Sequence, residues 1–448
     1  MATNHQQFQI KLTTFSPLHI GNGEELTSVG EFLQTNDNVY FLRHEDLMEK
    51  LKTDNHFDDY VERILTHDQG FDFFKTLKDW DITPADFAIR TLRLNQKDIN
   101  TNSNNKLHLH IKTKGEAYVP GSSIKGMLRT SILFRYLKEN PQELRTIESD
   151  ILQRLSEKNT LRTVRHYWEK KERELMPEKV FQSIRPYDTD CVSDDKLVIE
   201  QTYRQSLSQE SMDASKGLDW LSECIDKGVE LPLEMTICSD FENADFKYLK
   251  SSTLKPLFNC INEYTKKLII QERQLVNTAN PLPPIKSALL VQLQQYEDLL
   301  STANDDYAIA RMGKGKTIFF QTIIPLLKME VQDAILNLLK KEPGEFPRTR
   351  VLTVQDKQMM GWVKLEEIRP ELKLPINQME GMVNIGTQLR AIITGPKKVG
   401  LILNGSPLTN VSLILMFKHQ KLTEGETINV LVHQMSKDGR IIQVKFNT

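Results

Sequence analysis

The chain has 448 residues, of which 39% are hydrophobic, and a formal net charge of −2 at pH 7. This length allows about two to four domains with a sizeable core, while the near-neutral charge argues against a free-standing nucleic-acid binder, which usually carries a basic excess. No apolar run approaches the roughly 18–20 residues that a membrane helix needs, and no signal peptide is visible at the start, so we expect a cytoplasmic protein without membrane contact.

The cysteines give no sign of a metal site. Cys191, Cys224, Cys238 and Cys260 are widely spaced and form no C-x-x-C pair, so neither zinc nor a disulfide framework is expected. We therefore predict reduced structural thiols, no metal and no cofactor. Any binding of nucleic acid must come from local basic patches, and the acidic remainder suits a subunit that packs against other proteins.

The first expected element is a half-buried strand over residues 8–15, where apolar and polar residues alternate. It ends at a Ser-Pro turn that leads into a glycine-containing loop. Short strands at 31–33 and 39–42 are separated by Asn and Asp residues, a pattern typical of a hairpin. A charged helical stretch is predicted from about residue 44 to about residue 95.

A helix N-terminus suited to meet a phosphate is predicted next. Residues 95–105 are Asn-rich and predict a loop, and strict alternation over 106–113 predicts a strand. A Pro-Gly-Ser-Ser turn then leads into a helix over 123–140, with Lys125 and Arg129 four residues apart on one face. Free backbone N–H groups, the positive end of the helix dipole and two cations favour a phosphate. An ordinary capped helix with solvated cations is the alternative.

The middle of the chain is expected to be mainly helical. Residues 141–180 are heavily charged, and their basic run 162–173 is interleaved with aromatic residues. That run could touch RNA or a partner, although charged helices are usually solvated faces. The remaining elements are strands at 197–205 and 232–238 and helices at 254–276 and from the Pro-rich break at 280–284 to about residue 303.

A third glycine loop, Gly-Lys-Gly-Lys-Thr, lies at residues 313–317 and is named the Gly-Lys loop. We expect it to lie over an RNA backbone, because its glycines allow close approach and its two lysines supply charge. The following residues, 318–323, are β-branched and aromatic and predict a strand.

The same loop admits a different interpretation. With Ala310 in place of the first glycine, residues 310–317 fit a relaxed P-loop, G-x-x-x-x-G-K-[ST]. A P-loop lies between a strand and a helix, whereas no helix start follows here and no downstream strand ends in a Mg²⁺-binding Asp. An NTPase dependent on Lys316 is therefore a third-ranked hypothesis.

Beyond an expected linker at 341–347 the pattern changes to β. Strands are predicted within 386–403, 410–417, 425–433 and 440–446, the last two joined by a Ser-Lys-Asp-Gly turn. Short strands with Gly-rich turns over about 100 residues predict a small β-barrel of the OB type. Lys397 and Lys398 could touch RNA or form a solvated turn, and the pattern leaves open whether the barrel binds RNA or protein.

Three motifs together resemble the CRISPR-associated RAMP superfamily. Residues 15–24, FSPLHIGNGE, resemble its opening motif, residues 118–130, YVPGSSIKGMLRT, resemble its second motif, and the Gly-Lys loop is similar to its glycine-rich loop. The resemblance covers roughly residues 8–345. Chain length and motif spacing are most similar to the Csm-type subunit at the head of the type III-A effector complex, although type III-B relatives are not separated from it.

The resemblance implies an α+β fold with two ferredoxin-like (RRM-like) RAMP modules that carry helical insertions, followed by the OB-like barrel. We place the N-terminal module at residues 1–240, the second module with the Gly-Lys loop at 241–345, and the barrel domain at 346–448.

The resemblance also implies a function in antiviral defence. A subunit of this kind binds the 3′ region of CRISPR RNA without catalysis of its own, and supports guide maturation and complex assembly. Its partners would be the backbone RAMP subunit, the small subunit and recruited host nucleases. Single-stranded guide RNA would be held through phosphate contacts and shape, with little sequence preference.

The predicted RNA-binding residues come from the three motifs. They are His19, Gly21, Gly23, Gly121, Ser122, Ser123, Lys125, Gly126, Arg129, Arg311, Gly313, Lys314, Gly315 and Lys316. No catalytic or metal-ligating residue is expected. The runner-up hypothesis is an RNA-processing endoribonuclease of the same superfamily in which His19 is a general acid or base, although a His in a glycine loop can also stack or hydrogen-bond.

Overall fold

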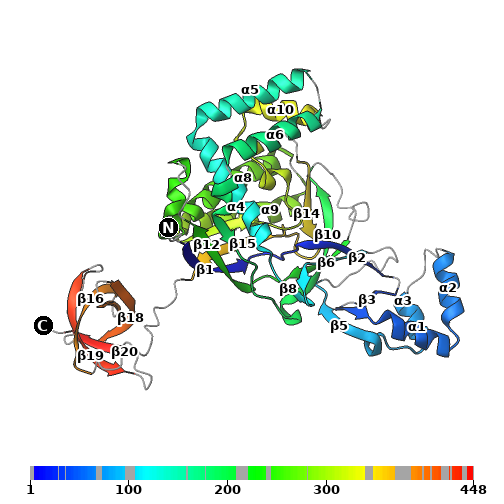
Figure 1. Ribbon diagram of the computed structural model, residues 1–448. Coiled ribbons are helices and arrows are strands. Elements are labelled where there is room, and N and C mark those ends of the chain that lie inside the picture. Colours follow the sequence, from blue (N-terminus) through cyan, green and yellow to red (C-terminus); the bar gives the residue numbers. More distant parts are fainter. Residues whose placement is uncertain are drawn as a thin grey trace. The chain divides into compact units, whose positions relative to one another are not determined.

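Two five-stranded sheets form the centre of residues 1–367 in the computed structural model (Figure 1). Sheet A has the strand order β13 (Tyr307–Arg311), β15 (Trp362–Glu367), β1 (His5–Thr14), β12 (Glu230–Cys238) and β9 (Ile184–Pro186). Sheet B has the order β14 (Thr349–Thr353), β10 (Leu197–Ser206), β11 (Trp220–Ile225), β6 (Lys106–His110) and β2 (Gly21–Thr27). The predicted α+β class is confirmed.

The structure describes most of the chain, with gaps. The described residues are 5–28, 30–35, 37–66, 73–95, 106–157, 160–176, 178–207, 220–238, 244–279, 281–338, 347–368, 385–395, 398–403, 406–414, 423, 426–435 and 441–446. Four predicted connections lie wholly or mostly outside them, namely the 95–105 loop, the 341–347 linker, the turn with Lys397 and the Ser-Lys-Asp-Gly turn.

The alternation in the first strand explains its central place in sheet A. Its apolar residues Phe8, Ile10 and Leu12 are buried, as every second residue of a strand faces the same side. Leu12 lies opposite Leu231 of β12 and opposite Leu365 of β15, and both pairings are antiparallel. The row of leucines fixes the register, because a slip by one residue would turn all of them away from the core.

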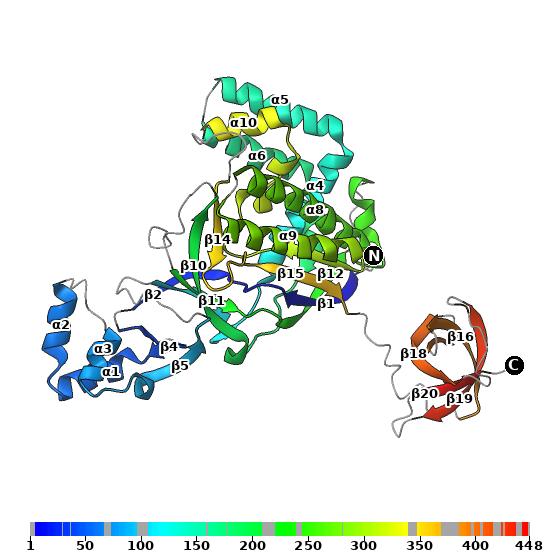
Figure 2. The same cartoon turned by 180° about the vertical axis from the view of Figure 1, so that it is seen from behind.

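Helices cover sheet A and extend beyond it (Figure 2). The helices next to the sheet are α4 (Gly121–Glu139), α8 (Lys255–Ala279) and α9 (Pro283–Thr302), where α8 packs against α4, α9 and β13. A further helical layer consists of α5 (Pro141–Glu157), α6 (Leu161–Leu175) and α10 (Met329–Leu338), and α7 (Glu178–Gln182) leads into β9.

A small lobe with its own hydrophobic core follows β2. It contains β3 (Phe32–Gln34), β4 (Asn38–Leu42) and β5 (Ala88–Arg93) with the helices α1 (His44–Thr53), α2 (Phe57–Leu65) and α3 (Phe73–Asp79). The predicted hairpin is confirmed as β3 and β4. The predicted helical stretch is wrong at its end, because residues 88–93 form a strand that places Leu92 opposite Val39. A two-residue hairpin of β7 (Lys112–Thr113) and β8 (Glu116–Ala117) leads towards α4.

One predicted strand is absent, and several strands of the two sheets were not predicted. Residues 318–323, predicted as β, contain the 3₁₀ turn η5 (Ile318–Gln321), followed by η6 (Ile324–Leu326). Phe320 packs edge-to-face on Trp362 with ring centroids 5.7 Å apart, so burial of aromatic rings overrides local β propensity here. The strands of sheets A and B that were not predicted are β2, β9, β11, β13, β14 and β15.

The division into compact units differs from the predicted domain boundaries. The units are residues 1–367 and 368–448, because β14 and β15, which follow the predicted boundary at 345, complete sheets B and A. Sheet A takes strands from all three predicted domains, so neither the boundary at 240 nor that at 345 separates independent sheets.

The second unit is a closed five-stranded barrel. Its strands follow the order β16 (Gln388–Gly395), β17 (Lys398–Leu403), β18 (Ser406–Ile414), β20 (Ile441–Phe446) and β19 (Thr427–Met435). The β18–β20 pair is parallel and the other pairs are antiparallel. Alternate apolar residues fill the barrel, including Ile393, Val399, Val430 and Val444. The predicted small barrel is confirmed.

Candidate functional site

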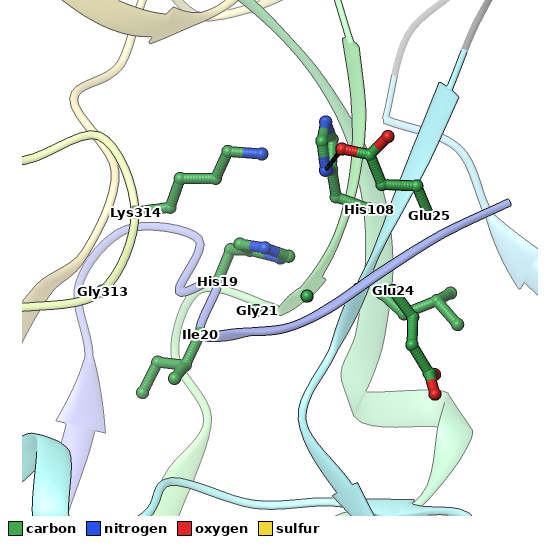
Figure 3. A pocket seen from close by; sticks show the side chains of 10 residues that line it. His19, Ile20, Gly21, Glu24, Glu25, His108, Gly313 and Lys314 are labelled. Carbon is green, nitrogen blue, oxygen red and sulfur yellow. Dashed lines mark ion pairs between the residues drawn. The ribbon is translucent and has the colours of Figure 1, made fainter.

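A pocket of about 310 Å³ opens where the loop after β1 meets the Gly-Lys loop (Figure 3). Its lining residues are His19, Ile20, Gly21, Gly23, Glu24, Glu25, His108, Leu109, Gly313 and Lys314. The fold thus brings together the first and third predicted motifs, which lie far apart in the sequence, and adds two residues of β6.

Backbone hydrogen bonds join these two loops directly. The Lys314 N–H donates to the His19 carbonyl at 2.8 Å, and the Gly361 N–H donates to the Pro17 carbonyl at 2.9 Å. The Met312 N–H in turn donates to the Gly361 carbonyl at 2.8 Å. The position of Lys314 is therefore set by main-chain contacts rather than by its own side chain.

Two glycines make this junction sterically possible. Gly313 and Gly361 have φ values of +74° and +83°, a region that other residues rarely adopt. A Cβ atom on Gly313 would lie closer than 3.0 Å to the His19 carbonyl oxygen, and one on Gly361 would overlap the Met312 carbonyl oxygen in the same way. Only glycine fits where the loops approach this closely.

Lys314 is half-buried and reaches into the pocket towards His108 (Figure 3). Burial lowers the pKa of Lys314 to about 8. It forms no ion pair with any residue that the structure describes, and its Nζ atom lies 5.0 Å from the centre of the Trp220 ring. A partly desolvated cation without a carboxylate partner is suited to bind an anion.

The carboxylate nearest to this lysine in the pocket already has partners. Glu25 accepts a hydrogen bond from Lys106 Nζ at 2.8 Å, and His108 Nδ1 lies 3.2 Å from its other oxygen. The Lys106 hydrogen bond lowers the pKa of Glu25, and burial together with the Lys314 charge lowers the pKa of His108. The negative charge of Glu25 is thus balanced without Lys314.

His19 lines the pocket as a buried, neutral side chain. Its Nδ1 donates to the Glu223 carbonyl at 2.7 Å, which leaves a lone pair on Nε2. Burial lowers the pKa of His19 to about 3, and the nearby His110 and Lys314 act in the same direction. A group with this pKa is neither a proton donor nor an efficient base near neutral pH, so the geometry disfavours the endoribonuclease hypothesis.

A second buried histidine links the opening motif to the second motif. His110 Nδ1 accepts from the Ile20 N–H at 3.2 Å, so its protonated Nε2 donates to the Tyr118 carbonyl at 3.0 Å. Burial lowers the pKa of His110 to about 4, which keeps the ring neutral. Its role is to hold two loops together.

The helix N-terminus of the second motif is not open as expected. The Gly121 N–H donates to the Asp188 carboxylate at 2.8 Å, so an anion from the chain itself occupies this position. Gly121 is buried, and a Cβ there would overlap the Pro186 carbonyl oxygen. Ser122 is exposed, while Ser123 is half-buried with its N–H directed to Pro120.

The two cations of the second motif lie along α4 and do not line the pocket. Lys125 Nζ and Arg129 Cζ lie 4.6 Å and 5.2 Å from the centre of the Phe181 ring. Arg129 also pairs with Glu172 at 2.9 Å, whereas burial and the neighbouring Arg185 lower the pKa of Lys125. Gly126, also on α4, is exposed.

Arg311 shapes the Gly-Lys loop from inside the protein. It is 3% exposed, and its guanidinium donates to the Met360 carbonyl at 2.9 Å and to the Gly315 carbonyl at 3.0 Å. The prediction that Arg311 contacts RNA is therefore corrected, because its donors are used within the core. Lys316 is half-buried, and burial together with Arg311 lowers its pKa.

The surroundings of the Gly-Lys loop differ from those of a P-loop. Strand β13 precedes the loop, but the four-residue 3₁₀ turn η5 follows it where a P-loop needs a helix. This disfavours the NTPase hypothesis. Within the described residues, no group of three or more His, Cys, Asp or Glu side chains is arranged to hold a metal ion, and no helix combines the length and apolar character needed to cross a membrane.

Several residues at the site were not predicted from the sequence. His108 and His110 are two apart on a predicted strand, so their shared face was a usable signal. Trp220 and Gly361 carry no local signal, because their roles depend on which distant strands pair.

Comparisons with known proteins give one family and a set of relatives. The family model for the RAMP superfamily matches residues 11–342. The CRISPR system Cms protein Csm5 of Methanocaldococcus jannaschii is 24% identical over 344 residues, covering 71% of this chain and 73% of the relative. The Csm5 proteins of Enterococcus italicus and Streptococcus thermophilus are each 29% identical, over 145 and 143 residues, and these matches span only 42% and 40% of the two relatives.

Solved structures share the fold. A chain in the cryo-EM structure of a Csm-crRNA-target RNA ternary complex of a type III-A CRISPR-Cas system aligns with a TM-score of 0.56 and 19% identity, covering 80% of this chain and 100% of that chain. The crystal structure of T. onnurineus Csm5 aligns with a TM-score of 0.52 and 18% identity, covering 79% and 99%.

Proposed function

The chain belongs to the RAMP superfamily, and from that premise we propose that it is a non-catalytic RNA-binding subunit of a type III-A CRISPR (Csm) ribonucleoprotein. In this proposal it binds the 3′ region of CRISPR RNA, contacts the backbone and small subunits of the complex, and supports guide maturation by recruited nucleases. Support comes from the similarity to three Csm5 proteins and from the fold shared with a chain of a Csm–RNA complex.

The main structural support for the proposed RNA binding is the environment of Lys314. Main-chain hydrogen bonds fix its backbone, burial holds its ammonium group in a pocket, and it has no ion pair within the described part of the chain. Structural lysines on a protein surface are usually solvated or paired with a carboxylate. A half-buried lysine without a carboxylate partner among the described residues is suited to a phosphate of the RNA backbone, which contributes affinity without sequence preference.

We further propose that the chain contains two ferredoxin-like modules and an OB-type barrel. Sheets A and B would represent the cores of two ferredoxin-like modules whose strands are interleaved along the chain. The barrel would be of the OB type, because its order β16-β17-β18-β20-β19 and its parallel β18–β20 pair form a five-stranded Greek key.

Substitution of Lys314 by Met tests the proposal. We expect the affinity of the full chain for single-stranded RNA of mixed sequence to fall about tenfold, and the slope of log K against log salt to decrease by about 0.7, because one phosphate contact is lost. Fluorescence anisotropy over a salt series measures both quantities.

The matched control is Lys266→Met, which removes the same charge from an exposed position on α8. It should leave the affinity and the slope close to those of the unmodified chain. If Lys314→Met and Lys266→Met behave alike, the pocket is not the phosphate site.

Assembly is tested by purification from the native host. The tagged chain should bring down small RNAs of repeat-plus-spacer structure together with other Csm subunits. Recovery of the chain alone, without RNA, would contradict the proposed complex.

A further inference from the structure

Trp220 lies beside the pocket at the start of β11 and is not used by phosphate binding. Its indole ring is partly exposed, with Lys314 Nζ at 5.0 Å and Arg204 Cζ at 5.8 Å from the ring centre. His108 approaches the same ring edge-on, with ring centroids 6.3 Å apart and an interplanar angle of 84°. The indole therefore has two cations and an imidazole around it.

This environment differs from that of a packing tryptophan. Trp362 is fully buried and stacks on Tyr296 with ring centroids 4.0 Å apart in a hydrophobic core. Trp220, by contrast, belongs to no hydrophobic cluster among the described residues. The indole N–H groups of both tryptophans lack a hydrogen-bond partner within the described part of the chain. Its partial exposure and its absence from these hydrophobic clusters, rather than the unpaired N–H, distinguish Trp220 from a packing tryptophan.

The positive charges around the Trp220 ring indicate which class of ligand could bind there. A cationic ligand is disfavoured, since Lys314 and Arg204 already hold positive charge at the ring. A free phosphate would bind the ammonium group of Lys314 but would make no favourable contact with the indole ring. An unpaired nucleotide uses both, because its base offers a π-face to an aromatic ring and its phosphate attracts the cation.

We propose that Trp220 is a stacking platform for one unpaired nucleobase of the bound RNA, with Lys314 at the neighbouring phosphate. When RNA binds, the ammonium group of Lys314 moves from the ring to the phosphate and the base takes its place over the indole. This inference rests on the proposed RNA-binding function and deepens it, by assigning recognition of the base to a residue outside the three sequence motifs.

The test separates stacking from charge, using the full chain and a single-stranded RNA oligonucleotide. Trp220→Leu is expected to weaken binding about tenfold, without changing the salt slope, because stacking releases no counterions. Trp220→Phe keeps an aromatic face and should stay within about threefold of the unmodified chain. An oligonucleotide of the same length without bases should bind the unmodified chain and Trp220→Leu equally.

A second readout does not depend on the leucine variant being folded. The unmodified chain should show quenching of tryptophan fluorescence when the RNA binds, and Trp220→Phe should bind with that quenching lost. Unchanged quenching in Trp220→Phe, or equal losses for the normal and the baseless oligonucleotide in Trp220→Leu, would overturn the stacking role.

Failure of the underlying function would give a different pattern. The unmodified chain would then bind neither oligonucleotide, whatever residue stands at position 220. If the unmodified chain binds RNA normally and Trp220→Leu binds it with the same affinity, only the stacking role is rejected.

Discussion

At the scale of single residues, the pocket shows how burial sets side-chain chemistry. His19 and Lys314 are neighbours through a backbone hydrogen bond, and desolvation disfavours the charged form of both. The imidazole, with its pKa near 3, is neutral throughout the physiological range, whereas the ammonium, with its pKa near 8, is still mostly charged at pH 7. The same loop junction therefore contains a neutral imidazole, His19, and a mostly charged ammonium group, Lys314.

The pKa of Lys314 predicts a pH dependence of RNA binding. Only the protonated form attracts a phosphate, so affinity should be greatest below pH 8 and should fall as the pH rises from 7 to 9. Lys314→Arg keeps its charge throughout this range and should remove the dependence. Anisotropy titrations at constant ionic strength measure the effect, and an equally steep pH profile in the arginine variant would contradict it.

The glycines at the loop junction predict unequal costs of substitution. Gly361→Ala should lower the free energy of unfolding by about 3 kcal/mol, since the new methyl group meets the Met312 carbonyl oxygen. Gly23→Ala is the matched control, because Gly23 also has a positive φ of +92° but open space around it, and about 1 kcal/mol of backbone strain is expected. Urea unfolding compares them, and equal costs would show that the junction is not tightly packed.

At the scale of elements, one buried carboxylate ties three segments together. Glu272 of α8 accepts from Arg350 Nε of β14 at 2.7 Å, and both side chains are almost fully buried. Its other oxygen accepts from the Thr317 hydroxyl at 3.3 Å, at the end of the Gly-Lys loop. A helix, an edge strand of sheet B and the loop are thereby held in one arrangement.

Breaking this buried pair should be costly. Glu272→Gln is expected to lower the free energy of unfolding by about 3–5 kcal/mol, because the Arg350 charge would stay buried without a counter-charge. The control is Glu297→Gln. It removes the negative charge that pairs with Arg273, a partly exposed residue of α8, and should lower the free energy of unfolding by less than about 1 kcal/mol. Denaturant unfolding distinguishes them, and similar midpoints for the two variants would argue against a buried pair.

At the scale of the whole molecule, strands from both ends of residues 1–367 share the same sheets. In sheet A, β15 lies between β13 and β1, so one of the last strands of the unit holds the first strand in place. This topology makes the unit depend on residues well beyond the Gly-Lys loop. The barrel of residues 368–448 forms a separate compact unit.

Two truncations test this organisation. A chain that ends at Glu367 keeps all strands of both sheets and should unfold cooperatively. A chain that ends at Glu345 lacks β14 and β15, which leaves β13 without its partner, and it should not reach the native fold. Circular dichroism during heating reports the outcome. A cooperative transition in the shorter chain would mean that sheet A does not need β15.

The sequence alone determined the motifs and part of the elements. Alternation and helical periodicity record which face of a segment is buried, so β1, β6, β12, α4 and α8 were predicted close to their observed positions. The glycine loops and their lysines could be recognised because close backbone approach and local charge are properties of short segments. The RAMP family followed from the same motifs.

The tertiary structure alone decided which of these segments meet. It joined the opening motif to the Gly-Lys loop, placed Asp188 at the helix N-terminus of the second motif, and buried Arg311. It also brought Trp220 to the pocket edge. The physical reason is that the periodicity of a segment shows which of its faces is buried, but not which other segment packs against that face. Strand pairing over long distances in the sequence depends on the packing of the whole core rather than on any local pattern.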